Sequence, residues 1–154
     1  MPELLEKIKE FLKENDINFT VTTHKPVYTS EEAAAVRNVD LKTGAKAMVI
    51  RSEGRFYLFV ICADRKIDFK KVKQILNSKS VSFATEEEVM KISGCHIGAV
   101  PPFGNLFDLD VYVDNSILSV ENINFNAGRN DTSIFMKRED YINIVKPEIV
   151  DFSQ

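Results

Sequence analysis

The sequence predicts a single α+β domain whose mixed, largely antiparallel sheet is surrounded by helices. Helical and strand-like segments are interspersed along the chain, two long apolar strands are joined by a short turn, and no regular strand–helix–strand repeat occurs. The 154 residues have the length of one domain and include no linker, repeat or low-complexity segment. We therefore expect residues 1–154 to fold as one unit.

The N-terminal part of the chain predicts a helix, a strand and a second helix. Apolar residues at positions 4, 5, 8, 11 and 12 follow helical spacing, and that helix ends at Asn15-Asp16. Residues 19–22 alternate between apolar and polar, as in a strand. Thr29 and Glu32 have the spacing of a capping box, in which Thr29 caps a helix of residues 30–36 and Glu32 reaches back.

The central segment predicts a β-hairpin. Residues 45–51 and 56–62 are apolar runs separated by Ser52-Glu53-Gly54. Both runs are apolar on both faces, so we expect this hairpin at the centre of the sheet.

The C-terminal half predicts shorter elements. Thr85 and Glu88 form a second capping box, and Gly94 follows the helix that this box begins. We expect helices at residues 70–76, 86–92 and 139–145. We expect strands at residues 81–83, 109–113, 133–136 and, at an edge, 149–152, with a turn at 126–131.

Composition and charge exclude several classes of function. The net charge of −3 argues against a broad, non-specific nucleic-acid binder but allows contact with one end of an RNA. No apolar run approaches the ~20 residues of a membrane-spanning helix. The segment that begins Met1-Pro2-Glu3 has no pattern of a signal peptide. We therefore expect a cytoplasmic protein that has no membrane partner.

The cysteines and histidines do not predict a metal site or a disulfide. Without a secretion signal, Cys62 and Cys95 are expected to be free thiols. Cys95 adjoins His96, but the base that activates a nucleophile normally comes from elsewhere in the fold. His24 is the other histidine, so we expect no metal and no cofactor.

Lys46 is the first candidate for a chemical role. Strand alternation places it on the same face as Met48 and Ile50, and a lysine on an apolar face is unusual. Either its ammonium reaches water from the end of the strand, or it supplies a fixed positive charge to a pocket. Periodicity alone does not decide between these two readings.

The segment GCHIGAVPPFG, residues 94–104, is the second candidate. It holds three of the six glycines and two of the five prolines. Glycine permits positive φ and close approach of a ligand to the main chain. The N–H groups of Gly98, Ala99, Phe103 or Gly104 could therefore hold a carbonyl oxygen or an oxyanion. The alternative is a structural turn after the preceding helix.

Four motifs together carry a resemblance to a known family. They are THKPVYTSEEAAAV at 23–36, GAKAMVIR at 44–51, GCHIGAVPPFG at 94–104 and NAGRNDTSIFM at 126–136. In this order and spacing they resemble the YbaK/prolyl-tRNA synthetase-associated domain family of aminoacyl-tRNA deacylases, from about residue 15 to residue 136.

The resemblance implies a fold, an activity and a site. It implies a sheet curled into a partial barrel, and hydrolysis of the ester that joins a wrong amino acid to the acceptor end of a tRNA. A prolyl-tRNA synthetase or another translation component is the expected further partner. The implied catalytic residues are Lys46, Gly98 and Ala99. The implied substrate-binding residues are His24, Thr29, Val100, Pro101, Pro102, Phe103, Gly104, Asn126, Gly128 and Asn130.

The implied mechanism needs little machinery, because an aminoacyl ester is already reactive. The loop N–H groups would hold the ester carbonyl, and Lys46 would bind a terminal phosphate or the carbonyl region. The neighbouring ribose hydroxyl would orient the attacking water.

Two positions depart from the family's pattern. Ala47 stands where some relatives have a polar residue that helps to hold the amino group, and Asn130 stands where some have a histidine. One methylene changes binding by only ~1–3 kcal/mol, so alanine, serine, threonine and cysteine all remain open as cargo. The resemblance favours alanine on proline tRNA.

Two other functions compete with the hydrolase. A non-catalytic module of the same fold would recognise RNA ends or a synthetase, and the presence of Lys46 and of the complete loop argues for the enzyme instead. A small-molecule esterase would need a nucleophilic triad, and the sequence shows none that is evident.

Overall fold

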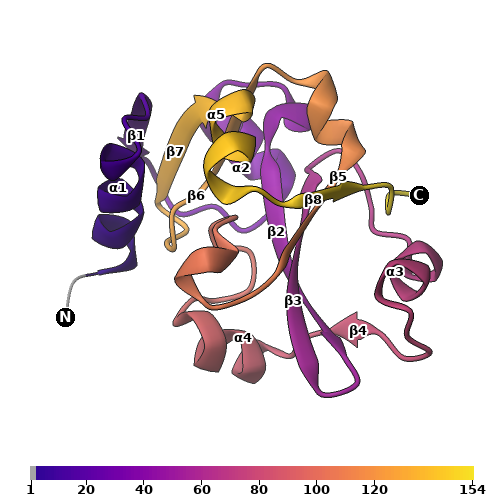
Figure 1. The fold of residues 1–154 in the computed structure, drawn as a ribbon. Helices are drawn as coiled ribbons and strands as arrows, with labels where there is room; N and C mark the ends of the chain where they lie inside the picture. Colours follow the sequence, from indigo (N-terminus) through magenta and orange to yellow (C-terminus); the bar gives the residue numbers. More distant parts are fainter. Residues whose placement is uncertain (1–2) are drawn as a thin grey trace.

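A computed structural model describes residues 3–154 and confirms one α+β domain (Figure 1). Five helices accompany eight strands in this part of the chain. The helices are α1 (Leu4–Glu14), α2 (Ser30–Arg37), α3 (Phe69–Leu76), α4 (Glu86–Ser93) and α5 (Arg138–Val145). The strands are β1 (Phe19–Thr23), β2 (Ala45–Ser52), β3 (Arg55–Cys62), β4 (Ser82–Phe83), β5 (Val111–Asp114), β6 (Asn122–Asn126), β7 (Thr132–Lys137) and β8 (Glu148–Val150).

The strands form two sheets, where the sequence predicted one. The antiparallel sheet has the order β1-β7-β6, and the larger sheet has the order β4-β2-β3-β5-β8. The β2–β3 hairpin lies at the centre of the larger sheet, as predicted, and β8 is an edge strand. The β3–β5 and β5–β8 pairings are parallel, so this sheet is mixed. Within residues 3–154 neither sheet closes on itself, so the partial barrel is not confirmed.

Strand β6 is the element that the sequence analysis missed. Its sequence NINFN alternates asparagine with apolar residues, and Ile123 and Phe125 are each 1% exposed. Asparagine is depleted in strands, so this alternation was not predicted as a strand. A parallel bridge between Gly44 and Asn124 joins β6 to the start of β2, so the two sheets meet where the predicted site residues gather.

The helix caps follow the sequence, with one correction. Thr85 and Glu88 make the full capping box, with both hydrogen bonds present. Thr29 accepts a hydrogen bond from the Glu32 N–H at 3.1 Å. The predicted return contact from the Glu32 side chain is not found among the described residues, so Thr29 caps α2 alone.

The core lies on both faces of the larger sheet. One face of β2 contributes Ala45, Ala47 and Val49 to the main apolar cluster, and the other contributes Ile50 to a smaller one near α3. Phe103 is fully buried in the main cluster, 5.4 Å from the ring of Phe125 and edge-on to it. The predicted loop is therefore anchored in the core through its C-terminal end.

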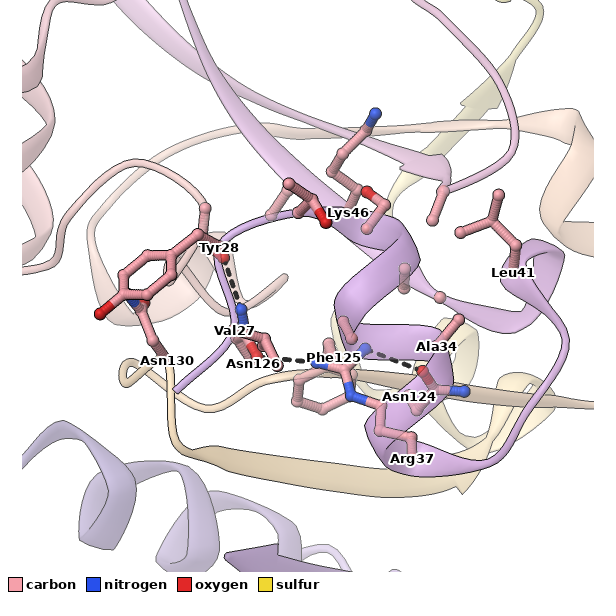
Figure 2. Close-up of a pocket in the computed structure, with 18 of the residues that line it drawn as sticks. Val27, Tyr28, Ala34, Arg37, Leu41, Lys46, Asn124, Phe125, Asn126 and Asn130 are labelled. Atoms are coloured by element: carbon pink, nitrogen blue, oxygen red, sulfur yellow. Dashed lines mark hydrogen bonds between the residues drawn. The ribbon is translucent and has the colours of Figure 1, made fainter. Parts of the chain in front are cut away.

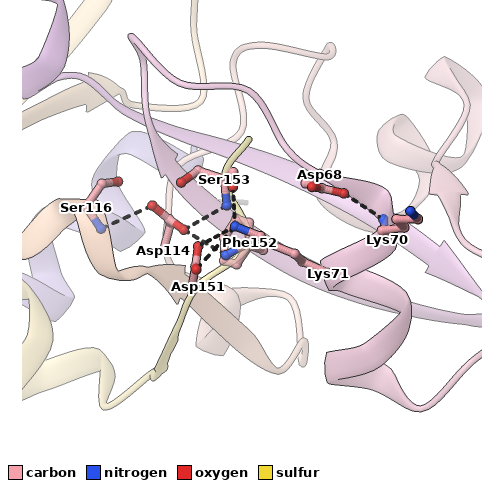
Figure 3. Close-up of polar contacts among 8 residues, drawn as sticks. All are labelled: Asp68, Lys70, Lys71, Asp114, Ser116, Asp151, Phe152 and Ser153. Atoms are coloured by element: carbon pink, nitrogen blue, oxygen red, sulfur yellow. Dashed lines mark hydrogen bonds and ion pairs between the residues drawn. The ribbon is translucent and has the colours of Figure 1, made fainter.

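A buried carboxylate fixes the C-terminal segment (Figure 3). Asp114 is fully buried, and its oxygens accept hydrogen bonds from the N–H groups of Ser116, Phe152 and Ser153 at 2.8–3.1 Å. Burial alone would raise the pKa of this carboxyl, but the hydrogen bonds outweigh it and lower the pKa. These bonds join the end of β5 to the C-terminal segment, so this network serves the fold.

The helices of this domain are short. Among residues 3–154, none is long and apolar enough to span a bilayer.

Candidate functional site

A cavity of about 240 Å³ opens where the two sheets meet (Figure 2). Its walls come from α2 and the segment before it, from the start of β2, from residues 97–100 and from β6 with the turn that follows. Six of the predicted site residues line it: Thr29, Lys46, Gly98, Val100, Asn126 and Asn130. The fold thus brings together motifs that lie up to about 100 residues apart in the sequence.

Seven predicted site residues lie outside the lining of this cavity. They are His24, Ala99, Pro101, Pro102, Phe103, Gly104 and Gly128. Phe103 fills the core, and the Pro102 carbonyl accepts a hydrogen bond from the buried Tyr141 hydroxyl at 2.6 Å. At Gly104 a Cβ would collide with the carbonyl oxygen of Leu109, so glycine is required there for close packing. The C-terminal half of the loop is therefore a structural anchor.

Two residues of the loop that line the cavity have an N–H group without an acceptor among residues 3–154. The N–H of Ala99 donates to the His96 carbonyl at 3.0 Å, and that of Phe103 donates to the Pro101 carbonyl at 2.8 Å. The N–H groups of Gly98 and Val100 have no acceptor among residues 3–154. Val100 is only 4% exposed, and buried N–H groups are rarely left unpaired. Gly98 and Val100 are thus the cavity-lining residues of the loop with a free N–H; the Gly104 N–H also has no acceptor among the described residues, but Gly104 lies outside the lining.

Gly98 adopts a conformation that fits this arrangement. Its φ of +91° is in the region that favours glycine, and a Cβ there would meet nothing within 4 Å. The requirement for glycine at this position is therefore one of backbone conformation. The carbonyl of Gly98 accepts a hydrogen bond from Asn126 Nδ2 at 2.8 Å, which fixes the orientation of the next peptide.

Lys46 supplies an unpaired positive charge at the cavity wall. It lies on the strand face of Met48 and Ile50, as predicted, and is half-buried. Burial lowers the pKa of its ammonium, Glu31 opposes that shift, and Lys66 adds to it. No hydrogen bond or ion pair to this ammonium is found within residues 3–154. A half-buried cation without a partner is available to a ligand.

Arg37 is the cavity residue that the sequence analysis did not single out. Burial lowers the pKa of its guanidinium to about 10. No carboxylate of the described residues lies within ion-pair distance of it. Its nitrogens donate instead to Ser133 Oγ (2.7 Å), Asn124 Oδ1 (3.0 Å) and Asn126 Oδ1 (2.7 Å). Figure 2 shows Arg37 and Lys46 on opposite sides of the cavity.

The Arg37 network reaches His24 and fixes its tautomer. The Nδ1 of His24 faces the Lys25 carbonyl at 2.8 Å, and a carbonyl only accepts, so Nδ1 carries the hydrogen. Ser133 Oγ accepts from Arg37 and donates its own hydrogen to His24 Nε2 at 2.7 Å. His24 therefore supports the network from behind the cavity.

Asn126 connects the network to the loop. Its Oδ1 accepts from Arg37, while its Nδ2 donates to Gly98. Because an asparagine side chain has both a donor and an acceptor, Asn126 links Arg37 to Gly98, whose own N–H is free. A basic residue near an alanine-rich helix end looks solvent-exposed in sequence, and only the position of β6 buries Arg37.

Cys95 and His96 do not form a catalytic pair. Both cysteines are free, as predicted, and both are buried; burial raises the pKa of the Cys95 thiol. His96 turns outward and contacts Glu86 through Nδ1 at 2.9 Å. Within residues 3–154 no group of three or more His, Cys, Asp or Glu side chains is arranged to hold a metal ion.

Fold and cavity together define a class of site: a small α+β domain that offers a cation and unpaired main-chain donors to a ligand. Residues 24–144 match the model of the aminoacyl-tRNA editing domain family. The chain belongs to this family, which confirms the resemblance found in the sequence.

Two curated relatives match nearly the whole chain. The multifunctional Ser/Thr-tRNA deacylase ProXp-y of Escherichia coli strain K12 is 31% identical over 152 residues, which cover 96% of this chain and 91% of the relative. The prolyl-tRNA editing protein ProX of Acetoanaerobium sticklandii is 33% identical over 141 residues, covering 88% of this chain and 86% of the relative.

A solved structure shares the fold. It is described as a candidate trans-editing enzyme for prolyl tRNA synthetase, with a TM-score of 0.88, 20% identity and coverage of 100% of this chain and 99% of that one.

Proposed function

We propose that this protein is a trans-editing hydrolase that removes a wrongly attached amino acid from tRNA by cleaving the aminoacyl ester. The family and the names of its relatives support this reaction class. The observation that carries the proposal is the cavity, where the unpaired Lys46 ammonium and the free N–H groups of Gly98 and Val100 line one space.

In the proposed reaction, the loop polarises the ester. The N–H groups of Gly98 and Val100 donate to the carbonyl oxygen, and they stabilise the negative charge that develops there when water attacks. Water adds to the carbonyl carbon, the C–O bond to the ribose breaks, and the ribose oxygen takes a proton. The Ala99 N–H is already paired, so it is replaced in this role by that of Val100.

Lys46 binds the anionic part of the substrate in this scheme. Its ammonium is held in a partly desolvated position, where an ion pair is stronger than in water. The phosphate next to the terminal ribose is the nearest anion that the substrate offers. The hydroxyl adjacent to the ester orients the water, so that the substrate assists its own hydrolysis.

The proposed cargo is a small amino acid. Alanine, serine, threonine and cysteine are the candidates, and alanine on proline tRNA is favoured. Thr29, Asn126 and Asn130 are the proposed polar contacts of the cavity, and Arg37 joins them. The non-catalytic binding module is the second candidate, but the two free N–H groups beside a free cation favour the enzyme.

A deacylation assay on a panel of mischarged tRNAs tests the proposal. The wild type should release alanine, serine, threonine or cysteine from at least one tRNA, and Lys46→Ala should not. If every ester survives the wild type, the hydrolase proposal fails. Should Lys46→Ala match the wild type, the assignment of Lys46 fails although the activity stands.

A partner in translation accompanies the proposed activity. With a net charge of −3, the chain should bind bare tRNA weakly and gain affinity from a synthetase or another translation component. Titration of tRNA at increasing salt, with and without prolyl-tRNA synthetase, measures this. Tight binding to bare tRNA that does not change with salt would contradict it.

A further inference from the structure

The outer edge of β2 is open beside the cavity. Strand β4 pairs with β2 only at Ile50 and Arg51, and β3 occupies the other edge along the whole strand. Among the described residues, the stretch around Ala47 thus has no strand paired to it on its outer side. Ala47 is 5% exposed, so the main chain there is buried without a ladder partner.

The pairing pattern shows which groups of Ala47 face that edge. In an antiparallel ladder, alternate residues direct both N–H and C=O to the same neighbour. The Ala63 N–H donates to the Gly44 carbonyl across the hairpin, whereas the Val49 carbonyl accepts from Ala84 on the outer side. Odd-numbered residues of β2 therefore face outward. The N–H and C=O of Ala47 point away from β3, and neither has a partner among residues 3–154.

A second, apolar cavity adjoins this edge. It has a volume of about 160 Å³ and extends from β2 toward β4 and α4. Its floor includes the buried Val49, Ala84 and Val89, and its rim includes Ile97, which is 48% exposed. Ala47, Gly98 and Val100 line both cavities, so the open edge lies at the junction of the polar and the apolar space.

We infer that the main chain of Ala47 binds the aminoacyl group, and that the apolar cavity receives its side chain. This inference rests on the proposed function. The Ala47 carbonyl accepts a hydrogen bond from the α-ammonium, and the loop N–H groups hold the ester carbonyl. Ala47 has no polar side chain for the amino group, and the open edge provides main-chain groups in its place.

The arrangement makes the site stereospecific. Three groups on one α-carbon, the ammonium, the ester carbonyl and the side chain, each have a separate partner in the protein. A D-amino acid that keeps two of these contacts must direct its side chain away from the apolar cavity. The apolar cavity has few polar groups, so the site also favours an aliphatic side chain over one with a hydroxyl.

Hydrolysis of four esters on one tRNA minihelix tests the inference with the wild-type protein. The esters are L-alanyl, D-alanyl, propionyl and L-seryl. Each enzymatic rate is divided by the spontaneous rate of the same ester, because the ammonium itself activates the carbonyl. A charge-assisted hydrogen bond is worth about tenfold or more. We expect the acceleration to be at least about tenfold larger for L-alanyl than for D-alanyl or propionyl, with L-seryl between them.

A pair of exposed residues provides matched variants. Ile97→Ser replaces the apolar side chain at the rim of the apolar cavity, which also lines the polar one. Leu118→Ser replaces a side chain of similar exposure, 49%, that lines neither cavity. The L-to-D ratio should fall in Ile97→Ser and stay unchanged in Leu118→Ser. Equal acceleration of L-alanyl, D-alanyl and propionyl esters would overturn the inference but leave the deacylase standing. No acceleration of any ester would remove the proposed function and this inference with it.

Discussion

Two buried polar networks lie in different parts of this small domain, and they differ in completeness. At Asp114 three main-chain N–H groups meet one carboxylate, and the network joins β5 to the C-terminal segment. At the cavity, Arg37 has no carboxylate partner, Lys46 has no partner, and Gly98 and Val100 keep free N–H groups among the described residues.

The difference separates structure from function. Unpaired polar groups in a protein interior destabilise the fold, so a chain retains them where a ligand completes the set. The Asp114 carboxylate already has its main-chain partners and needs no ligand, although the neighbouring Ser116 hydroxyl is buried without a partner among the described residues. In the cavity network, Arg37 is hydrogen-bonded to Ser133 and Asn126. The Lys46 ammonium and the N–H groups of Gly98 and Val100 have no partner among the described residues. Substitutions at Asp114 should therefore lower stability, and substitutions at the cavity should lower the deacylation rate.

The largest expected effect is that of Lys46→Met. Loss of the charge that binds the phosphate beside the ester should lower kcat/KM for deacylation by about 10- to 100-fold, the size of one hydrogen bond between charged groups. The thermal midpoint should stay equal or rise, because burial disfavours the charged ammonium in the folded state. Calorimetry and single-turnover kinetics on the same sample measure both. If the variant loses stability and activity together, Lys46 has a structural role and the assignment to substrate binding fails.

Asp114→Asn should show the opposite pattern. The amide cannot accept as a charged group from three N–H donors, and its own N–H₂ faces them, so unfolding free energy should fall by about 2–3 kcal/mol. Urea denaturation measures this loss. The deacylation rate at a temperature where the variant is folded should match that of the wild type. A specific loss of rate would show that the two networks are coupled.

Asn126→Asp should break the link between the cavity network and the loop. The Oδ1 contact to Arg37 remains, but a carboxylate oxygen replaces the donor and faces the Gly98 carbonyl. The kcat should fall by about tenfold, the upper end for loss of one neutral hydrogen bond, with little change in KM. Asn122→Asp, on the same strand at an exposed position, is the control. Equal effects from both variants would show a general effect of charge.

Acid should reduce the contribution of Asp114 to stability. Its folded-state pKa is lowered, so its contribution is fully present above the unfolded pKa of about 3.9 and is lost as pH falls through the folded value. The stability difference between wild type and Asp114→Asn should therefore shrink below about pH 4. A difference that stays constant from pH 6 to pH 2 would contradict this.

Most of the fold could be predicted from the sequence because its signals are local. The 45–51 and 56–62 hairpin, the cap at Thr85 and the edge strand near Ile149 follow from patterns of a few residues. The division into two sheets did not, because the pairing of β1 with β7 joins residues more than 100 positions apart. The asparagines of β6 made that strand hard to predict, because asparagine is rare in strands. Two of them, Asn124 and Asn126, accept hydrogen bonds from Arg37.

The lining of the cavity was predicted in part. Lys46, Gly98 and Val100 line the cavity, and the motifs in the sequence had indicated all three. Which half of the loop faces the cavity depends on Phe103, whose burial could not be read from a proline-rich segment. Arg37 required knowledge of what covers α2, and the open edge at Ala47 required the short length of β4.

The most direct test of the central claim is an NMR titration of the ¹⁵N-labelled protein with a minihelix that carries alanine through a hydrolysis-resistant amide. In the proposed complex, the polar groups left unpaired at the cavity are the ones that bind substrate. The amide resonances of Gly98, Val100 and Ala47 should shift most, while those of Ala99 and Phe103, already paired, should shift little. Binding that perturbs Ala99 and Phe103 but leaves Gly98 and Val100 unchanged would contradict the account.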